Sequence, residues 1–231
     1  MFGSILDYLY VAFENRNGEI PKEIWHIKTN DGDSEDWICF LPEGILKFPY
    51  ARNRILSARN SDVYVIPKNA IQPDPKTTRK LLEEITKRAS DDYYKKRGDI
   101  NVLGVSLGNA PAYKFANYFP VKRFVSVVPG SLLPECIWES IATRKIAEKS
   151  GRTLENYREA LNNFSPARNL DNLKVNSLEI YLGKSDKMIP YERGKELVDE
   201  MEKKGLNPKT TIFSMSGHCE TILRFAWDFV I

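Results

Sequence analysis

The sequence predicts an α/β fold, in which a mostly parallel β-sheet is covered by α-helices on both faces. Short apolar runs recur along the chain, segments with helical spacing lie between them, and the intervals suit crossover connections between parallel strands. The length of 231 residues is enough for one domain with a sizeable core, or at most two small ones. We therefore expect a single domain over residues 1–231.

The first third of the chain predicts strands joined by turns. FENRNG (13–18) ends in Asn-Gly, a strong hairpin signal, and EIWHIKT (23–29) suits the returning strand. We expect this N-terminal hairpin to give the sheet an antiparallel edge. WICFL (37–41) is short, apolar and bounded by Pro42, which is typical of a strand buried on both faces.

Strand-like and helical segments then alternate to the end of the chain. The strand-like runs are apolar and short, whereas the helical segments have apolar residues three or four positions apart. Strands are expected over 61–67, 100–106, 123–130, 177–183 and 210–216, and helices within 75–97, 109–119, 191–204 and 221–231. This alternation indicates right-handed crossovers between parallel strands.

One segment interrupts the alternation. About 46 residues separate the strand ending at Gly130 from the strand starting at Ser177, which is too many for one crossover helix. Residues 135–150 have isoleucines near helical spacing, and a second helix is expected from Thr153 to the Ser-Pro pair that begins at Ser165. We expect 131–176 to be a helical insertion that lies over one end of the sheet as a lid.

Charge and composition exclude several classes of protein. Lys and Arg number 34 against 31 Asp and Glu, and the two signs alternate without a one-sign block, so no nucleic-acid partner is expected. No apolar stretch approaches the roughly 20 residues of a membrane-spanning helix, and the N-terminus lacks the pattern of a secretory signal. The three cysteines have no metal-ligand spacing. We expect a cytoplasmic monomer or homodimer that needs no metal and no cofactor.

The sharpest local signal is the pentapeptide Gly104-Val105-Ser106-Leu107-Gly108. It lies where a predicted strand turns into a predicted helix. A nucleophile at such a turn is held in a strained backbone conformation, and side chains at the two glycine positions would collide with the neighbouring strand and helix. The alternative is a glycine-bracketed turn that only packs a helix tightly on the sheet.

A serine nucleophile needs a base, and the base needs an orienting carboxylate. The chain has two histidines: His26 lies mid-strand and is expected to pack at the sheet edge, whereas His218 follows the last strand in Ser-Gly-His. Asp186 follows the strand 177–183 and occupies the same rim, because loops at strand C-termini are where open α/β sheets place their sites. Helix capping is the alternative role for Asp186. For His218 the alternatives are a helix N-cap or a buried structural histidine.

In this arrangement the chain resembles the α/β-hydrolase family over nearly its whole length. Members of that family carry Ser, then Asp or Glu, then His, with the serine in a Gly-x-Ser-x-Gly turn. Here the three positions are Ser106, Asp186 and His218, and the predicted insertion falls where many members carry a lid. The resemblance implies that these three residues form a catalytic triad.

The resemblance also implies an oxyanion hole of two backbone N–H groups. One would come from Leu107, which follows the serine, and the other from the loop after the strand 37–41. This chain departs from the family there, with Leu-Pro-Glu-Gly in place of the common His-Gly. Because proline has no N–H, Pro42 cannot donate, and the register favours Glu43, with Gly44 as the second choice.

The function expected from these residues is hydrolysis of a carboxylic ester through an acyl-enzyme intermediate. The predicted lid is apolar, so the small-molecule ester is expected to carry an apolar moiety, with Trp138 and Met188 as candidate pocket residues. Thioester, lactone, amide or carbon–carbon bond hydrolysis on the same scaffold stays open, because a fold does not choose among them. A catalytically weak binding protein that keeps the fold also stays open.

Overall fold

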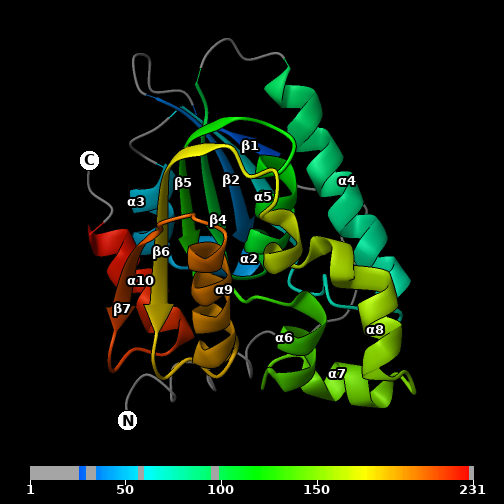
Figure 1. The fold of residues 1–231 in the computed structure, drawn as a ribbon. Coiled ribbons are helices and arrows are strands. Elements are labelled where there is room, and N and C mark those ends of the chain that lie inside the picture. Colours follow the sequence, from blue (N-terminus) through cyan, green and yellow to red (C-terminus); the bar gives the residue numbers. More distant parts are fainter. Residues whose placement is uncertain (1–25, 30–34, 57–59, 95–98, 229–231) are drawn as a thin grey trace.

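The structure, a computed structural model, describes residues 26–29, 35–56, 60–94 and 99–228. Seven strands in this part of the chain form one sheet in the order β1-β3-β2-β4-β5-β6-β7 (Figure 1). They are β1 (His26–Lys28), β2 (Asp36–Pro42), β3 (Asn60–Ile66), β4 (Asn101–Val105), β5 (Val121–Val127), β6 (Val175–Gly183) and β7 (Lys209–Phe213). Only β1, at the edge, is antiparallel to its neighbour, so the predicted mostly parallel sheet with an antiparallel edge is confirmed.

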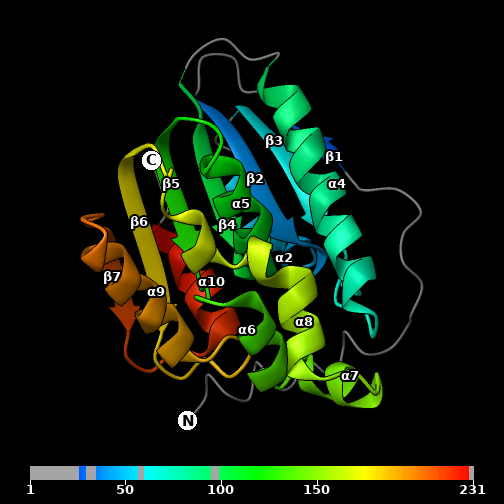
Figure 2. The ribbon, with the colours of Figure 1, turned by 45° about the vertical axis from the view of Figure 1, so that its right-hand side comes forward.

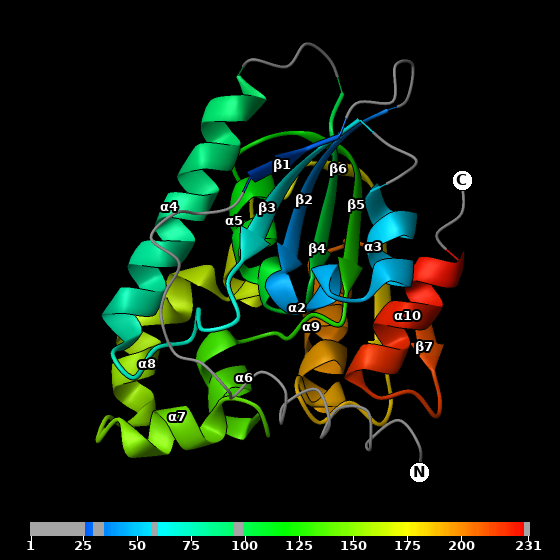
Figure 3. The same ribbon diagram turned by 180° about the vertical axis from the view of Figure 1, so that it is seen from behind.

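Helices cover both faces of the sheet, as predicted. One face is packed by α4 (Pro75–Tyr93), α5 (Asn109–Ala116) and α9 (Tyr191–Lys203), and the other by α3 (Pro49–Leu56) and α10 (His218–Asp228). Figure 2 shows the first group beside the sheet, and Figure 3 shows α3 and α10 from behind. The short helix α2 (Glu43–Leu46) follows directly on β2.

The position of β2 inside the sheet explains why its sequence is continuously apolar. Successive side chains point to opposite faces of a sheet. Ile38 and Phe40 accordingly belong to the core cluster on the α4–α5–α9 side, whereas Trp37, Cys39 and Leu41 belong to the cluster on the α3–α10 side. All five side chains are buried, because this central strand has a hydrophobic layer on each face.

The insertion consists of α6 (Leu133–Glu139), α7 (Arg144–Lys149) and α8 (Leu154–Leu161), followed by the 3₁₀ turns η2 (Asn162–Phe164) and η3 (Pro166–Asn169). Figure 1 shows α6 and α7 beyond the ends at which the strand arrows point. Helix α8 packs against α4 and α6. The predicted start at Thr153 is confirmed, because its side chain and that of Asn156 form a reciprocal capping box.

The single helix expected over 135–150 is wrong. The chain leaves helical geometry at Ser140, whose φ and ψ are −67° and 134°. The Thr143 hydroxyl donates to the Ile137 carbonyl at 2.7 Å, and the Ile141 N–H donates to the Lys187 carbonyl at 3.2 Å. These bonds take groups that a continuous helix would use, so α6 and α7 are separate.

Other predicted boundaries shift by a few residues. The last helix begins at His218 rather than at residue 221, so His218 is the first residue of α10 and not part of the preceding loop. The predicted hairpin turn at 13–18 lies outside the described residues. No helix in the described ranges combines the length and apolarity that crossing a membrane requires.

Candidate active site

Ser106 lies at the carboxyl end of the central strand β4, in a left-handed backbone conformation. Its φ is 54°, whereas Val105 before it is extended with φ of −126°. A left-handed conformation costs a non-glycine residue free energy, and such strain is found where the surrounding structure enforces it. The turn therefore projects the Ser106 side chain from the rim of the sheet, at the junction of β4 and the turn η1 (Ser106–Gly108).

The two glycines of the pentapeptide are required by close packing on either side. A Cβ atom at Gly104 would lie 2.6 Å from the Asn109 side-chain oxygen and 2.9 Å from the Ala112 Cβ of α5. A Cβ atom at Gly108 would lie 2.1 Å from the Phe40 carbonyl oxygen of β2. The first clash is with the following helix and the second with the neighbouring strand, as the sequence predicts.

Asn109 fixes the strained turn from within the core. Its side-chain NH₂ donates to the Ser106 carbonyl at 3.0 Å and to the Val127 carbonyl at 2.9 Å. Its side-chain oxygen accepts a hydrogen bond of 2.7 Å from the Ser126 hydroxyl. Asn109 is buried, so this amide ties the tip of β4 to the tip of β5 in a low-dielectric setting.

A continuous chain of hydrogen bonds joins Ser106, His218 and Asp186. The distance from Ser106 Oγ to His218 Nε2 is 2.8 Å, and that from His218 Nδ1 to Asp186 Oδ2 is 2.7 Å. A carboxylate only accepts hydrogen bonds, so Nδ1 carries the proton and Nε2 of the neutral ring accepts from the serine hydroxyl. The His218 and Asp186 side chains are both buried.

The Asp186 carboxylate is held by its own loop. Its second oxygen, Oδ1, accepts hydrogen bonds of 2.8 Å from the Met188 and Ile189 backbone N–H groups. The Ser185 N–H donates to the Ser216 carbonyl at 3.0 Å, which joins the aspartate loop to the loop before His218. The carboxylate therefore has three hydrogen-bond partners, these two N–H groups and His218 Nδ1, and they set its orientation toward the imidazole.

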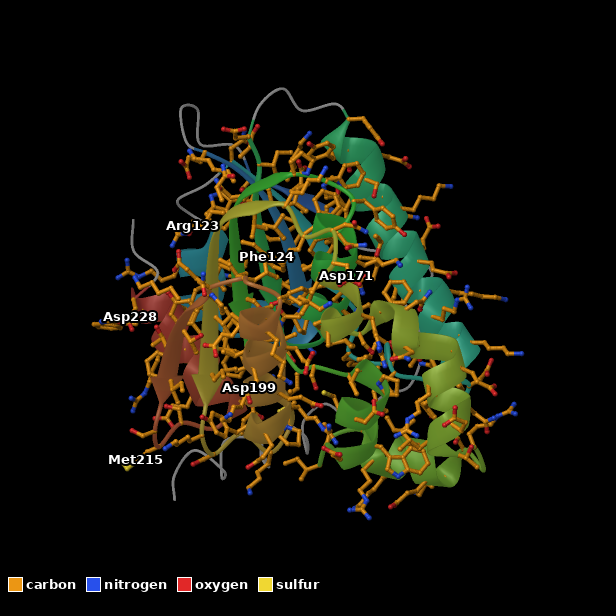
Figure 4. All side chains as sticks on the ribbon, viewed as in Figure 1. Arg123, Phe124, Asp171, Asp199, Met215 and Asp228 are labelled. Atoms are coloured by element: carbon orange, nitrogen blue, oxygen red, sulfur yellow. The ribbon has the colours of Figure 1, made fainter. Side chains whose placement is uncertain are left out.

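His218 is positioned by the start of α10, of which it is the first residue. The preceding loop carries Met215 at the solvent-exposed edge of the molecule (Figure 4) and returns the chain to the sheet. Gly183 allows this return, because a Cβ atom there would lie 2.2 Å from the Thr221 hydroxyl of α10. The absence of a side chain at Gly183 therefore lets α10 pack against the end of β6.

A mainly apolar cavity of about 290 Å³ opens beside Ser106 and His218. The insertion supplies Leu133, Ile137 and Ile146 to its wall. The rim of the sheet and its loops supply Pro42, Ile45, Ile71, Met188 and Ile189. The lining thus comes from α6 and α7, from residues at or just after the ends of β2, β3 and β4, and from α10. A mainly apolar cavity with a few polar groups at its edge is typical of small-molecule sites.

Solved structures of similar architecture were found, although no family model and no curated protein matches the sequence. The acylaminoacyl peptidase of Pyrococcus horikoshii is 14% identical with a TM-score of 0.61, over 92% of this chain and 39% of that one. A puromycin-hydrolyzing peptidase of Mycobacterium tuberculosis is 14% identical with a TM-score of 0.58, over 85% and 33%. A lipase-esterase related protein of Clostridium acetobutylicum is 14% identical with a TM-score of 0.55, over 90% and 99%.

The chain has the α/β-hydrolase fold. It spans between 33% and 39% of the length of the two peptidases, but 99% of the lipase-esterase related protein. At this level of identity the similarity establishes the fold, which agrees with the strand order and with the position of Ser106 at the tip of β4. The chemistry has to be argued from the site itself.

The other residues that the sequence singled out lie partly in the cavity and partly outside it. Leu107 and Met188 line the cavity. Trp138 is not among the lining residues; its ring packs edge-on against Tyr157 at 5.8 Å, and the adjacent Ile137 faces the cavity instead. His26 lies at the sheet edge, as expected, and bonds to Asp62 at 2.9 Å.

Glu43 begins α2, immediately after Pro42. The first N–H groups of a helix have no carbonyl partner within it, so α2 itself leaves the Glu43 and Gly44 N–H groups unused. The Glu43 carboxylate accepts a hydrogen bond of 3.1 Å from the Lys68 N–H and pairs with Lys47 at 3.3 Å. Its negative charge is therefore paired with the Lys47 ammonium at the end of α2, and its other oxygen is bonded to the backbone of the β3–α4 loop.

Sequence reasoning missed Asn109 as a residue of the site. Asparagine is common at helix starts, which explains its type without any further role. A signal was present in its position, directly after the Gly-x-Ser-x-Gly turn, but only the structure reveals its contacts with two strand tips.

Proposed function

We propose that this protein is a serine hydrolase that cleaves carboxylic esters through an acyl-enzyme intermediate. The observation that carries the proposal is the hydrogen-bonded chain Ser106–His218–Asp186, with distances of 2.8 and 2.7 Å, at the edge of a mainly apolar cavity. A nucleophile, a base within hydrogen-bond reach and a carboxylate that orients the base are the elements that acyl transfer requires.

In this mechanism, His218 Nε2 removes the proton of Ser106 as the hydroxyl oxygen attacks the ester carbonyl carbon. Asp186 keeps the ring in the tautomer with the proton on Nδ1 and stabilises the imidazolium that forms. His218 then protonates the departing alcohol, which leaves the acyl group on Ser106. A water molecule, deprotonated by His218, attacks the acyl-enzyme and releases the acid with the serine restored.

The negative oxygen of the tetrahedral intermediate requires two donors. The proposed donors are the backbone N–H of Leu107 and that of Glu43, with Gly44 as the second choice. The hydrogen bond and ion pair of the Glu43 carboxylate with Lys68 and Lys47 support this assignment, because they offset a charge that would otherwise oppose an oxyanion nearby.

The insertion 131–176 is proposed as the lid of the site, within a single domain. Leu133, Ile137 and Ile146 from α6 and α7 contribute apolar wall to the cavity. Burial of apolar surface favours binding by about 25 cal/mol per Å², so these residues support an ester with an apolar moiety as the substrate. Met188, which also lines the cavity, is the proposed substrate contact from the loop after β6.

A fluorophosphonate probe tests the proposal, because it labels an activated serine. The native protein is expected to be labelled and to hydrolyse 4-nitrophenyl esters, whereas Ser106→Ala is expected to do neither. Ser214→Ala is the matched control, since Ser214 is an exposed serine close to His218 in sequence. Equal labelling of the native protein and Ser106→Ala would refute the proposal. A parallel panel of thioesters, lactones and amides would define the bond that is cleaved.

A further inference from the structure

Arg193 of α9 contacts the insertion at both ends of α6. At the end of α6, its guanidinium donates two hydrogen bonds to the Glu139 carboxylate, from Nε to Oε2 at 2.9 Å and from Nη2 to Oε1 at 2.5 Å. Just before the start of α6, the Arg193 carbonyl accepts a hydrogen bond of 3.0 Å from the Ser131 N–H. A single residue of the core helix α9 thus holds both ends of a helix that contributes to the cavity wall.

Glu196, three residues further along α9, adds to this contact. Its Oε2 accepts hydrogen bonds from Arg193 Nη1 at 2.9 Å and from the Ser131 hydroxyl at 2.5 Å. Burial opposes ionisation of Glu196, but these two hydrogen bonds outweigh it and lower the Glu196 pKa. The hydrogen bonds to Glu139 and Glu196 raise the pKa of Arg193. The contact therefore consists of charge-assisted hydrogen bonds, which are stronger than those between neutral groups.

The other polar contacts of α6 run to a different part of the insertion. Glu135 pairs with Arg158 of α8 at 2.8 Å, which joins two helices of the insertion to each other. The Leu133 N–H likewise donates to the Ser165 hydroxyl at 3.0 Å. In the described part of the chain, α6 thus has one ion pair inside the insertion and one, Glu139–Arg193, to the core.

The length of α6 makes its position depend on these contacts. It has seven residues and the following α7 has six, whereas helices shorter than about 12 residues are marginal on their own. Helix α6 contributes Leu133, Cys136 and Ile137 to the cavity lining. The contacts at Ser131 and Glu139 therefore bear on where this apolar wall lies relative to the serine nucleophile.

We propose that Arg193 is a positioning residue for substrate binding, which acts through α6 and favours esters with a long apolar chain. With the Glu139 contact intact, the α6 wall is in place before the ester binds. Without it, binding of a long chain has to supply the free energy of ordering α6, and part of the gain from apolar burial is lost. This inference rests on the proposed esterase function of Ser106 and deepens it, because it assigns chain-length selectivity to a contact behind the cavity wall.

The first test measures kcat and KM for two pairs of esters. 4-Nitrophenyl acetate and octanoate differ in the acyl chain, and methyl and octyl acetate differ in the alcohol chain. For at least one pair, Glu139→Ala is expected to raise the KM of the long ester about threefold to tenfold, the effect of one partly exposed ion pair, with kcat and the short ester unchanged. Lys195→Ala is the matched control, because it breaks the Lys195–Asp199 pair of 2.6 Å on the same helix without touching α6. It should leave both pairs of esters unchanged.

A second set of variants tests whether the effect runs through the Glu139–Arg193 contact. Residues that act through one contact are not additive, so Glu139→Ala should add nothing to the rise in KM caused by Arg193→Ala. Arg193→Lys keeps the charge but lacks the two-pronged guanidinium, so its KM for the long ester should lie between those of the native protein and Arg193→Ala. Rises in KM that multiply in the double variant would overturn the inference, because the two residues would then act separately.

The outcomes for Glu139→Ala separate the alternatives. An unchanged ratio of long-ester to short-ester KM in both pairs would overturn the inference. So would a loss of equal size on short and long esters together with a lower unfolding temperature, since the contact would then contribute only to stability. A lower KM for the long esters would overturn it as well, because α6 would then obstruct them. A rise in KM confined to a long ester would support it.

A binding measurement keeps this inference distinct from the proposed chemistry. Ser106→Ala, which cannot form the acyl-enzyme, is titrated with 2-decanone, and so is the double variant that also carries Glu139→Ala. The ketone is expected to raise the unfolding temperature of Ser106→Ala more than that of the double variant. Ester turnover by the native protein without this difference would overturn the role of Arg193 alone. Absence of turnover with the difference present would overturn only the esterase.

Discussion

Removal of the Asn109 amide should both destabilise the protein and relax the strained turn at Ser106. Asn109→Ala deletes three hydrogen bonds: a partly buried one to the Ser106 carbonyl, and two buried ones with the Val127 carbonyl and the Ser126 hydroxyl. At about 1 kcal/mol of net stability for each bond, the loss is about 3 kcal/mol, and the carbonyls left buried without a donor increase it. Urea unfolding followed by circular dichroism measures this loss as a shift in midpoint at constant slope.

A matched control is available at Asn117, which caps the C-terminus of the same helix. The Asn117 side chain accepts one exposed hydrogen bond, from the Asn172 N–H at 3.2 Å, so Asn117→Ala should cost well under 1 kcal/mol. The Asn109→Ala protein that remains folded should also hydrolyse esters about tenfold or more slowly, because the Ser106 carbonyl is no longer held and the hydroxyl loses its alignment. This reasoning would be refuted if Asn109→Ala lost as little unfolding free energy as Asn117→Ala, or if its kcat were unchanged.

Three further outcomes follow from single contacts. Gly108→Ala should abolish folding or cost about 3 kcal/mol or more, because its Cβ would lie 2.1 Å from the Phe40 carbonyl oxygen; a native unfolding temperature would contradict this. Burial opposes ionisation of Glu179, but the hydrogen bond and charge of Arg123 outweigh it and lower the Glu179 pKa below 4.5. The stability that the Arg123–Glu179 pair contributes is thus present above pH 4.5 and lost as pH falls through the lowered pKa. In urea unfolding from pH 3 to 7, Glu179→Gln should therefore weaken the fall in unfolding free energy at acid pH. An unchanged pH dependence would count against the pair. The kcat/KM of ester hydrolysis should rise with pH as His218 loses its proton, since only the neutral ring accepts from serine, and a flat profile would argue against His218 as the base.

The arrangement of the sheet could be predicted because its determinants are local. Apolar runs of strand length and intervening helical periodicity are properties of short segments, and the parallel pairing follows from their alternation. The approach of Ser106, Asp186 and His218 could be expected for the same reason, since each follows a strand and parallel strands end at one rim. The structure confirms this approach, because His218 lies within hydrogen-bond distance of both Ser106 and Asp186.

The break between α6 and α7 could not be predicted, because its cause is distant in sequence. The spacing of Ile137, Ile141 and Ile146 is compatible with one helix, and nothing local forbids it. The competing bond comes from the Lys187 carbonyl in the loop after β6, which captures the Ile141 N–H. A helix propensity of a few tenths of a kcal/mol per residue does not outweigh such a tertiary contact.

The two asparagines of the cavity show why residue type alone does not reveal a role. Asn69 lies in a turn and Asn109 at the start of a helix, so turn and helix-start preferences explain both without reference to a site. Hydrogen-bond accounting separates them: every polar atom of the Asn109 amide is paired within the core, whereas both atoms of the Asn69 amide are buried and unpaired. The paired amide is explained by the stability of the turn at Ser106. The unpaired amide lowers stability, because both of its polar atoms are removed from water without a hydrogen-bond partner.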